Sequence, residues 1–175
     1  GIKAYAGSSP NGLSLNVDNS RLYVSNGMDN AVAVISLGQK SSVSGIGKSY
    51  VRGYIPTEAY PAGLILVNNQ LVVANLESAG SSVFKASNHA SSIHNQLGSV
   101  SIIPVPTKTA LEKYTRSVYE MNLVSRIDEY QLPARNMVSP VPVPARLGEP
   151  SLFKHVVYII KENKTYDQVY GDMPK

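Results

Sequence analysis

Glu162 and Asn163 are the residues whose type and position most clearly suggest chemistry, because they follow a β-branched apolar run. The run is segment 152–160, which ends in Val-Val-Tyr-Ile-Ile, and we expect it to form a buried parallel strand. Ligands of α/β domains gather outside the carboxyl ends of such strands. A carboxylate and a carboxamide at that place suit a divalent cation and a phosphate group held against it. The sequence therefore predicts metal ligands at Glu162 and Asn163.

The same pair also has a plainer interpretation. Glu and Asn are common at strand-to-helix turns, where Asn163 or Thr165 would cap the helix and face solvent. One carboxylate and one amide do not hold a catalytic ion tightly, since such sites use three or more protein ligands. We expect this chain by itself to be catalytically inactive and to bind no metal stably, and we assign it no catalytic residue.

Three histidines are the next candidates for metal binding. His89 and His94 lie in a polar loop, 77–97, rich in Ser and Asn, and we expect them to be solvated rather than to form a metal pair. His155 precedes the apolar run, and we expect it to pack or hydrogen-bond at the edge of a strand.

Two further segments carry weaker signals. Segment 45–49, Gly-Ile-Gly-Lys-Ser, resembles part of a phosphate-binding loop but lacks its full spacing and a following helix. We expect a loop between strands there. Asp128 and Glu129 form an isolated acidic pair, which we assign to the solvent-exposed surface.

The composition indicates a globular sheet protein with many turns. Of 175 residues, 43% are hydrophobic and 16% charged, with eleven Tyr, two Phe and no Trp. Tyr-rich, β-branched sequence with many Ser, Asn and Gly residues is typical of sheets and tight turns. Cysteine is absent, which excludes disulfides, thiolate metal sites and a cysteine nucleophile.

The net charge of +4 comes from basic residues that are scattered along the chain rather than clustered. Nucleic-acid surfaces show clustering, so we predict no nucleic-acid partner. No apolar run approaches the ~20 residues that span a bilayer, so we predict no transmembrane segment. The chain begins at Gly1 without Met, and we expect a segment of a longer protein whose signal peptide lies elsewhere.

An internal repeat organises the first part of the chain. Pro-Asn-Gly-Leu-Ser-Leu returns as Pro-Ala-Gly-Leu-Ile-Leu, and Arg-Leu-Tyr-Val-Ser-Asn returns as Gln-Leu-Val-Val-Ala-Asn. Each copy reads as strand, Asn-rich turn, strand, loop and strand, and a further strand over 50–57 lies between the copies. The predicted strands are 10–15, 21–26 and 30–37 in the first copy and 61–66, 70–75 and 98–105 in the second.

Units of four short antiparallel strands with a period of roughly 40–50 residues are typical of β-propeller blades. Residues 1–106 then supply about two blades, whereas a closed propeller needs at least about four. We therefore expect the rest of a longer protein, or further chains, to complete the propeller. Two unclosed blades leave open strand edges, which predicts oligomerisation of the isolated chain.

After the repeats, the sequence no longer has the pattern of strands and turns. Over 107–125 the apolar residues recur at spacings of three and four, which predicts one amphipathic helix capped by Thr107 or Thr109. The apolar residues are Leu111, Tyr114, Val118 and Met121. Segment 126–150 is a Pro-rich connector, and its alternating prolines over 132–146 predict an extended backbone, with a domain boundary near 130–150. Segment 151–175 then opens a second domain.

The repeated segments resemble a known family. Ser-Pro-Asn-Gly at 9–12, Tyr-Ile-Pro-Thr at 54–57, Tyr-Pro-Ala-Gly at 60–63 and Val-Ala-Asn at 73–75 look like motifs of YncE-type or surface-layer-type β-propellers. The resemblance implies a binding platform.

Segment 155–172 resembles the opening strand of the phosphoesterase family in the alkaline phosphatase superfamily, which includes acid phosphatases and phospholipases C. The shared pattern is the apolar strand followed by Glu-Asn-Lys-Thr-Tyr-Asp. The resemblance implies that Glu162 and Asn163 contribute to the active-site metal and phosphate site. Thr165 matches a structural position of the family, and its Ser or Thr nucleophile and remaining ligands would follow Lys175.

Together these features predict a mainly β chain: a partial β-propeller, one amphipathic helix, a Pro-rich connector and the first strand of an α/β phosphatase-like domain. The first hypothesis is a segment of a secreted bacterial phosphoesterase, with a phosphate ester as substrate and a divalent metal ion in the complete domain. Its location would be extracellular, periplasmic or on the cell surface. The alternative is a noncatalytic β-propeller binding module at the cell surface, in which Glu162 and Asn163 are incidental.

Overall fold

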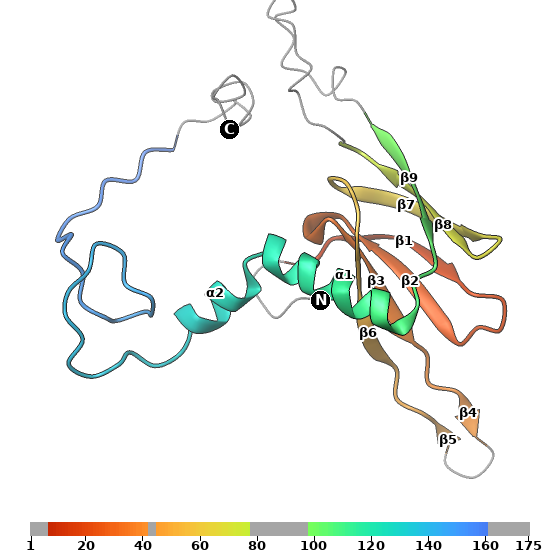
Figure 1. Ribbon diagram of the computed structural model, residues 1–175, viewed down its shortest axis with the longest axis horizontal. Helices are drawn as coiled ribbons and strands as arrows, with labels where there is room; N and C mark the ends of the chain where they lie inside the picture. The colour runs from red at the N-terminus through yellow and green to blue at the C-terminus, as the bar shows by residue number, and fades with distance from the viewer. Residues whose placement is uncertain (1–6, 42–44, 78–97, 161–175) are drawn as a thin grey trace, which may run out of the picture. The chain divides into compact units, whose positions relative to one another are not determined.

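The computed structural model describes residues 7–41, 45–77 and 98–160 (Figure 1). The chain divides into two compact units, one ending at Val118 and the other beginning at Tyr119. Within the described residues, no helix is both long and apolar enough to cross a membrane.

The first unit contains a four-stranded antiparallel sheet, called here the first sheet. Its strand order is β1-β2-β3-β6, so neighbours in the sequence are neighbours in the sheet. The strands are β1 (Pro10–Leu15), β2 (Arg21–Asn26), β3 (Ala31–Ser36) and β6 (Tyr50–Pro56). A short hairpin of β4 (Lys40–Ser41) and β5 (Gly45–Ile46) lies between β3 and β6 in the sequence.

The second sheet is antiparallel and has the order β7-β8-β9. Its strands are β7 (Pro61–Val67), β8 (Gln70–Asn75) and β9 (Ser99–Pro104). All the strands predicted from the repeat are thus confirmed, and the fold is mainly β. The second sheet has three strands among the described residues, not the four expected of each unit, so closure into propeller blades stays a prediction.

Both sheets use the same register in their first strand pair. Leu13 lies opposite Val24 in the first sheet, and Leu64 lies opposite Val73 at the corresponding place in the second. Each first strand has an irregular register just after its proline. Asn side chains support the tight turns, as in the β1–β2 turn, where Asn16 Oδ1 accepts a 2.8 Å hydrogen bond from the Arg21 N–H.

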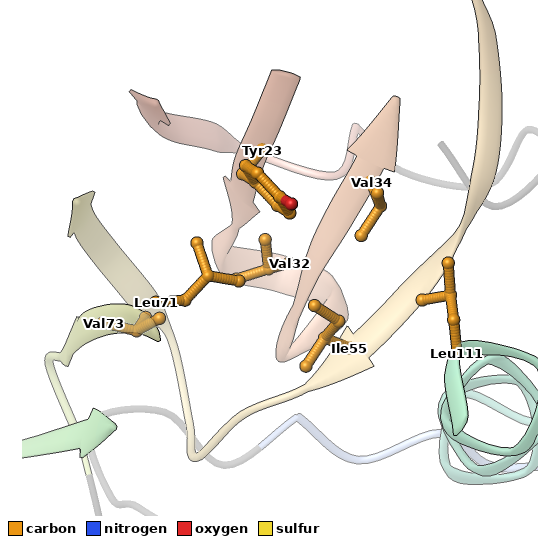
Figure 2. Close-up of a cluster of buried hydrophobic side chains, with 7 residues drawn as sticks. All are labelled: Tyr23, Val32, Val34, Ile55, Leu71, Val73 and Leu111. Atoms are coloured by element: carbon orange, nitrogen blue, oxygen red, sulfur yellow. The ribbon is translucent and has the colours of Figure 1, made fainter. Parts of the chain in front are cut away.

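The main core lies between the two sheets and includes one side chain from a helix (Figure 2). Tyr23 and Val32 from the first sheet and Leu71 and Val73 from the second are at most 1% exposed. Successive residues of a strand point to opposite faces, which explains why Tyr23 enters this core while Val24 enters a second one.

The predicted helix is confirmed as α1 (Lys108–Met121), and the Thr107 hydroxyl accepts a 3.3 Å hydrogen bond from the Ala110 N–H as a cap. Its apolar stripe is buried at Leu111 and Val118, which join the two cores. Tyr114 and Met121, which the spacing placed on the same stripe, remain exposed.

Helix α1 also closes the open edge of the first sheet. The outward N–H of Tyr54 in β6 donates a 2.9 Å hydrogen bond to Thr115 Oγ1. The helix comes so close that a Cβ on Gly53 would lie 3.0 Å from Leu111 Cγ and still closer to Thr115 Oγ1. A glycine at position 53 therefore permits the contact that protects this strand edge.

The second unit contains α2 (Val124–Tyr130) and an irregular segment without further helices or strands among its described residues. Helix α2 begins within the predicted helix and continues into the Pro-rich connector, but it ends before 132–146, the stretch expected to be extended. The sequence thus predicted one helix over 107–125 where the structure has two. The connector has no proline before Pro133, so nothing in the sequence stops a helix over 124–130.

Segment 152–160 contradicts the prediction of a buried strand. It has no strand assignment, and Val156, Val157 and Ile160 are 81%, 84% and 78% exposed. The β-branched residues favour an extended backbone, but a strand also needs a neighbour that accepts and donates its hydrogen bonds. No described strand pairs with this segment, so its propensity alone does not build a sheet.

Candidate functional site

The predicted metal ligands Glu162 and Asn163 lie outside the described residues, as do Thr165, His89 and His94. Among the residues that the structure describes, no group of three or more His, Asp or Glu side chains could hold a metal ion. The predicted metal site therefore stays a prediction.

Three sequence candidates fall within the described residues. His155 is exposed, and no strand edge lies there for it to join. Asp128 and Glu129 are exposed on α2, as predicted. Segment 45–49 is a loop between strands only in part: Gly45 and Ile46 form β5, and 47–49 lead into β6 rather than into a helix.

A pocket in the first unit gathers three cationic side chains that the sequence showed only as scattered basic residues. It has a volume of about 280 Å³ and is lined by Arg21, Arg52 and Lys108. Thr107 and Tyr23 line it as well, and apolar side chains of the core complete the wall. This pocket is the candidate functional site of the described residues.

Each cationic side chain lies either at the first residue of a strand or helix or at a strand bulge. Arg21 begins β2, and Lys108 begins α1. Arg52 is the extra residue where the β3–β6 register shifts, since Val34 lies opposite Gly53 and Ile35 opposite Val51. Such bulges re-aim a side chain out of the regular alternation. The amino end of α1 adds the positive end of its dipole.

The electrostatics of the pocket favour an anion. None of the described residues that line it is acidic, and Arg52 and Lys108 form no ion pair with any described residue. Asp18, in the β1–β2 turn, interacts only weakly with Arg21: the Ser20 hydroxyl and N–H, followed by the Asn16 side chain and Arg21, hold the pKa of its carboxyl below the ordinary value. The lining supplies positive charge and hydroxyl groups but no general base, so the pocket suits binding rather than catalysis.

A second polar cluster, in the second unit, was not found from the sequence. Glu149 is almost fully buried and accepts two hydrogen bonds from the Arg135 guanidinium, at 2.6 Å and 2.9 Å. Its carboxylate also accepts weaker bonds from the backbone N–H groups of Arg135 and Arg146. The Arg135 guanidinium is the main reason why the pKa of Glu149 falls to about 2.

The Arg135–Glu149 pair organises the irregular segment of the second unit rather than forming a reactive site. The carboxylate has all its lone pairs directed at donors of the same segment, which leaves no open position for a ligand. No local pattern in the sequence marks the pair, because the two residues approach only through the path of the loop.

Comparisons of the chain with protein-family models, with curated proteins and with solved structures find no match.

Proposed function

We propose that this chain is part of a secreted metal-dependent phosphoesterase in which the two sheets belong to a β-propeller that binds the substrate. The observation that carries the binding part is the pocket lined by Arg21, Arg52 and Lys108. The reaction is inferred from segment 155–172 and its resemblance to the phosphoesterase family.

The pocket suits the phosphate group of an ester in charge and chemistry. A phosphate monoester carries up to two negative charges, and Arg and Lys side chains are its usual partners in proteins. The Thr107 and Tyr23 hydroxyls supply further donors, while Val34 and Leu111 offer an apolar wall for the organic part of the ester.

The reaction would occur at Glu162 and Asn163 together with ligands from further sequence. A carboxylate and an amide are hard oxygen donors, which fits a divalent metal ion but is too few to hold it. When bound, the ion would stabilise negative charge on the phosphoryl group. The proposal takes the Ser or Thr nucleophile from further sequence.

The enzyme part is tested on the protein from its natural source. We expect an intact mass far above 18.8 kDa and hydrolysis of p-nitrophenyl phosphate that a chelator abolishes. Glu162→Gln should remove this activity, whereas the matched change Glu112→Gln on the exposed face of α1 should leave it intact. A mass near 18.8 kDa without turnover would contradict the proposal.

The binding part is tested on the chain itself by NMR titration with p-nitrophenyl phosphate. Arg52→Gln should weaken binding about tenfold or more, because a hydrogen bond to a charged group contributes about 1.5–3 kcal/mol. Arg116→Gln, an exposed change of the same type that lies outside the pocket, is the control. Equal affinities of the two variants would exclude this pocket as the phosphate-binding site.

A noncatalytic β-propeller binding module at the cell surface is the second candidate. The pocket favours it in one respect, since binding of an anion there requires neither a metal nor a nucleophile. Chelator-insensitive binding of the phosphate ester by the natural protein, without turnover, would select this alternative.

A further inference from the structure

The two sheets pack in the same orientation, one behind the other. We define the front face of the first sheet by Tyr23, Val32 and Val34, which face the second sheet. The second sheet meets them with its back face, which is formed by Leu64, Leu66, Leu71 and Val73. The repeat and the strand registers match β1, β2 and β3 to β7, β8 and β9. Each front-face residue of β1, β2 and β3 therefore has a counterpart, the residue at the same place in the second sheet.

The front face of the second sheet is apolar and uncovered. The counterparts of Val32 and Val34 are Val100 and Ile102, and both are 63% exposed, whereas Val32 and Val34 are at most 3% exposed. Ile65, also on this face, is 55% exposed. None of the described residues covers these side chains. This face is as apolar as a buried sheet face, yet no described residue packs on it.

The polar positions of the first front face have become apolar in the second. Ser14 accepts a 3.1 Å hydrogen bond from the Leu66 N–H, and Ser25 donates one of 3.0 Å to the Ala62 carbonyl. Their counterparts in the second sheet are Ile65 and Ala74. The second front face therefore suits a purely apolar contact.

A glycine gives an independent indication that a backbone approaches this face. A Cβ on Gly12 would lie 3.0 Å from both the Ala62 carbonyl oxygen and the Leu64 nitrogen, because β7 runs directly against it. A Cβ on its counterpart, Gly63, would meet nothing within 4 Å. The φ angle of Gly63 lies outside the left-handed region, so the backbone does not require glycine either. A glycine at position 63 leaves room for a closely packed backbone, as Gly12 does, but no described residue packs there.

The chain itself carries the surface that fits. At the existing contact, β7 packs along β1 and β2 and contributes Leu64 and Leu66. Their counterparts on the back face of the first sheet are Leu13 and Leu15, which are 66% and 48% exposed. Helix α1 covers a different part of that back face, where Val118 packs on β2, β3 and β6.

We propose that a second copy of this chain docks the back face of its first sheet, through Leu13 and Leu15, on the front face of the second sheet around Gly63 and Ile102. The contact repeats the apolar part of the packing already present within one chain, without the hydrogen bonds of Ser14 and Ser25. It is heterologous, so a pair of copies retains one unused face of each kind, and association continues into a chain or closes into a ring. The proposal depends on the packing of the sheets and not on the phosphoesterase assignment.

The test is sedimentation velocity of the full chain with two complementary variants. Wild type should show assemblies that grow with concentration, whereas Leu13→Lys and Ile102→Lys should each be monomeric, with a dissociation constant raised at least tenfold. Mixed in equal amounts, the two variants should form a heterodimer and nothing larger, because one intact face of each kind remains in the mixture. Val17→Lys, in a fully exposed turn, should behave as wild type.

Three outcomes would overturn the proposal. The first is a wild-type chain that stays monomeric at all accessible concentrations. The second is self-association of Leu13→Lys and Leu15→Lys at the wild-type affinity, which would indicate front-to-front packing instead. The third is a mixture of the two variants without a heterodimer. Since all these side chains except that of Leu15 are more than half exposed, and Leu15 nearly so, matching far-UV circular dichroism is expected throughout.

Discussion

Gly53→Ala should destabilise the first unit far more than the same change at an open strand glycine. The new methyl group would lie 3.0 Å from Leu111 Cγ and overlap Thr115 Oγ1, whereas non-bonded carbon atoms prefer about 3.5–4.0 Å. Helix α1 must therefore withdraw from β6. Overpacking of this kind costs about 1–3 kcal/mol.

The withdrawal carries a second cost. The 2.9 Å hydrogen bond from the Tyr54 N–H to Thr115 Oγ1 lengthens or breaks, and such a bond contributes about 1 kcal/mol. Gly63→Ala is the matched control, because its methyl group meets nothing within 4 Å and both glycines lie in strands. The free energies of unfolding of the two variants should differ by about 2–4 kcal/mol.

The assay is urea unfolding followed by tyrosine fluorescence, which is available because the chain has eleven Tyr and no Trp. It is run at a concentration where the chain is monomeric, so that the exposed face around Gly63 does not contribute. Adding Thr115→Ala to Gly53→Ala should cost about 1 kcal/mol less than Thr115→Ala alone, because the two changes remove one shared contact. A difference below about 0.5 kcal/mol between Gly53→Ala and Gly63→Ala would refute the reasoning.

Three other predictions concern buried groups. Ser25→Ala should lower the free energy of unfolding by about 1–3 kcal/mol, because the Gly12 N–H loses its 2.7 Å bond to the hydroxyl; thermal unfolding measures the loss. Val118→Ala should cost about 2 kcal/mol from two buried carbons and the remaining cavity, and Ser117→Ala beside it is the exposed control. The pKa of Glu149 is lowered to about 2 in the folded chain, so its contribution is complete above pH 4.5 and is lost as the pH falls through 2. Protection of the Arg135 amide from hydrogen exchange, taken relative to its intrinsic rate at each pH, should fall as the pH is lowered through 2, and Glu149→Gln should abolish this change in protection.

The strands and turns were predictable because their signals are local. A turn residue such as Asn19, which adopts the left-handed conformation at φ 54°, needs only its own short side chain to do so. The alternation of apolar residues in β2 and the spacing of Leu111 and Val118 in α1 likewise depend on neighbours a few positions away.

The arrangement of these elements was not predictable, because it depends on contacts between distant residues. The Asn30 side chain accepts a 2.9 Å hydrogen bond from the Tyr60 N–H, and no spacing rule connects these two positions. The same holds for Arg135 and Glu149.

The candidate site shows this limit most clearly. The sequence shows only scattered basic residues. In the structure three of them, Arg21, Arg52 and Lys108, line the same pocket although they are far apart in the sequence. A bulge, a strand start and a helix start bring them to one pocket. By contrast, segment 152–160 carried the strongest strand signal of the sequence and forms no strand, because a strand depends on a partner as well as on propensity.

The hydrogen bond between Tyr54 and Thr115 also sets an order for synthesis of the chain. The two residues are 61 positions apart, so at about 5–20 residues per second the ribosome needs roughly 3–12 s to deliver the helix after the strand. Hairpins form in about 1–10 μs, so the first sheet is complete long before its edge is covered. Throughout that interval the nascent chain carries an unprotected strand edge, open to pairing with neighbouring nascent chains on the same message.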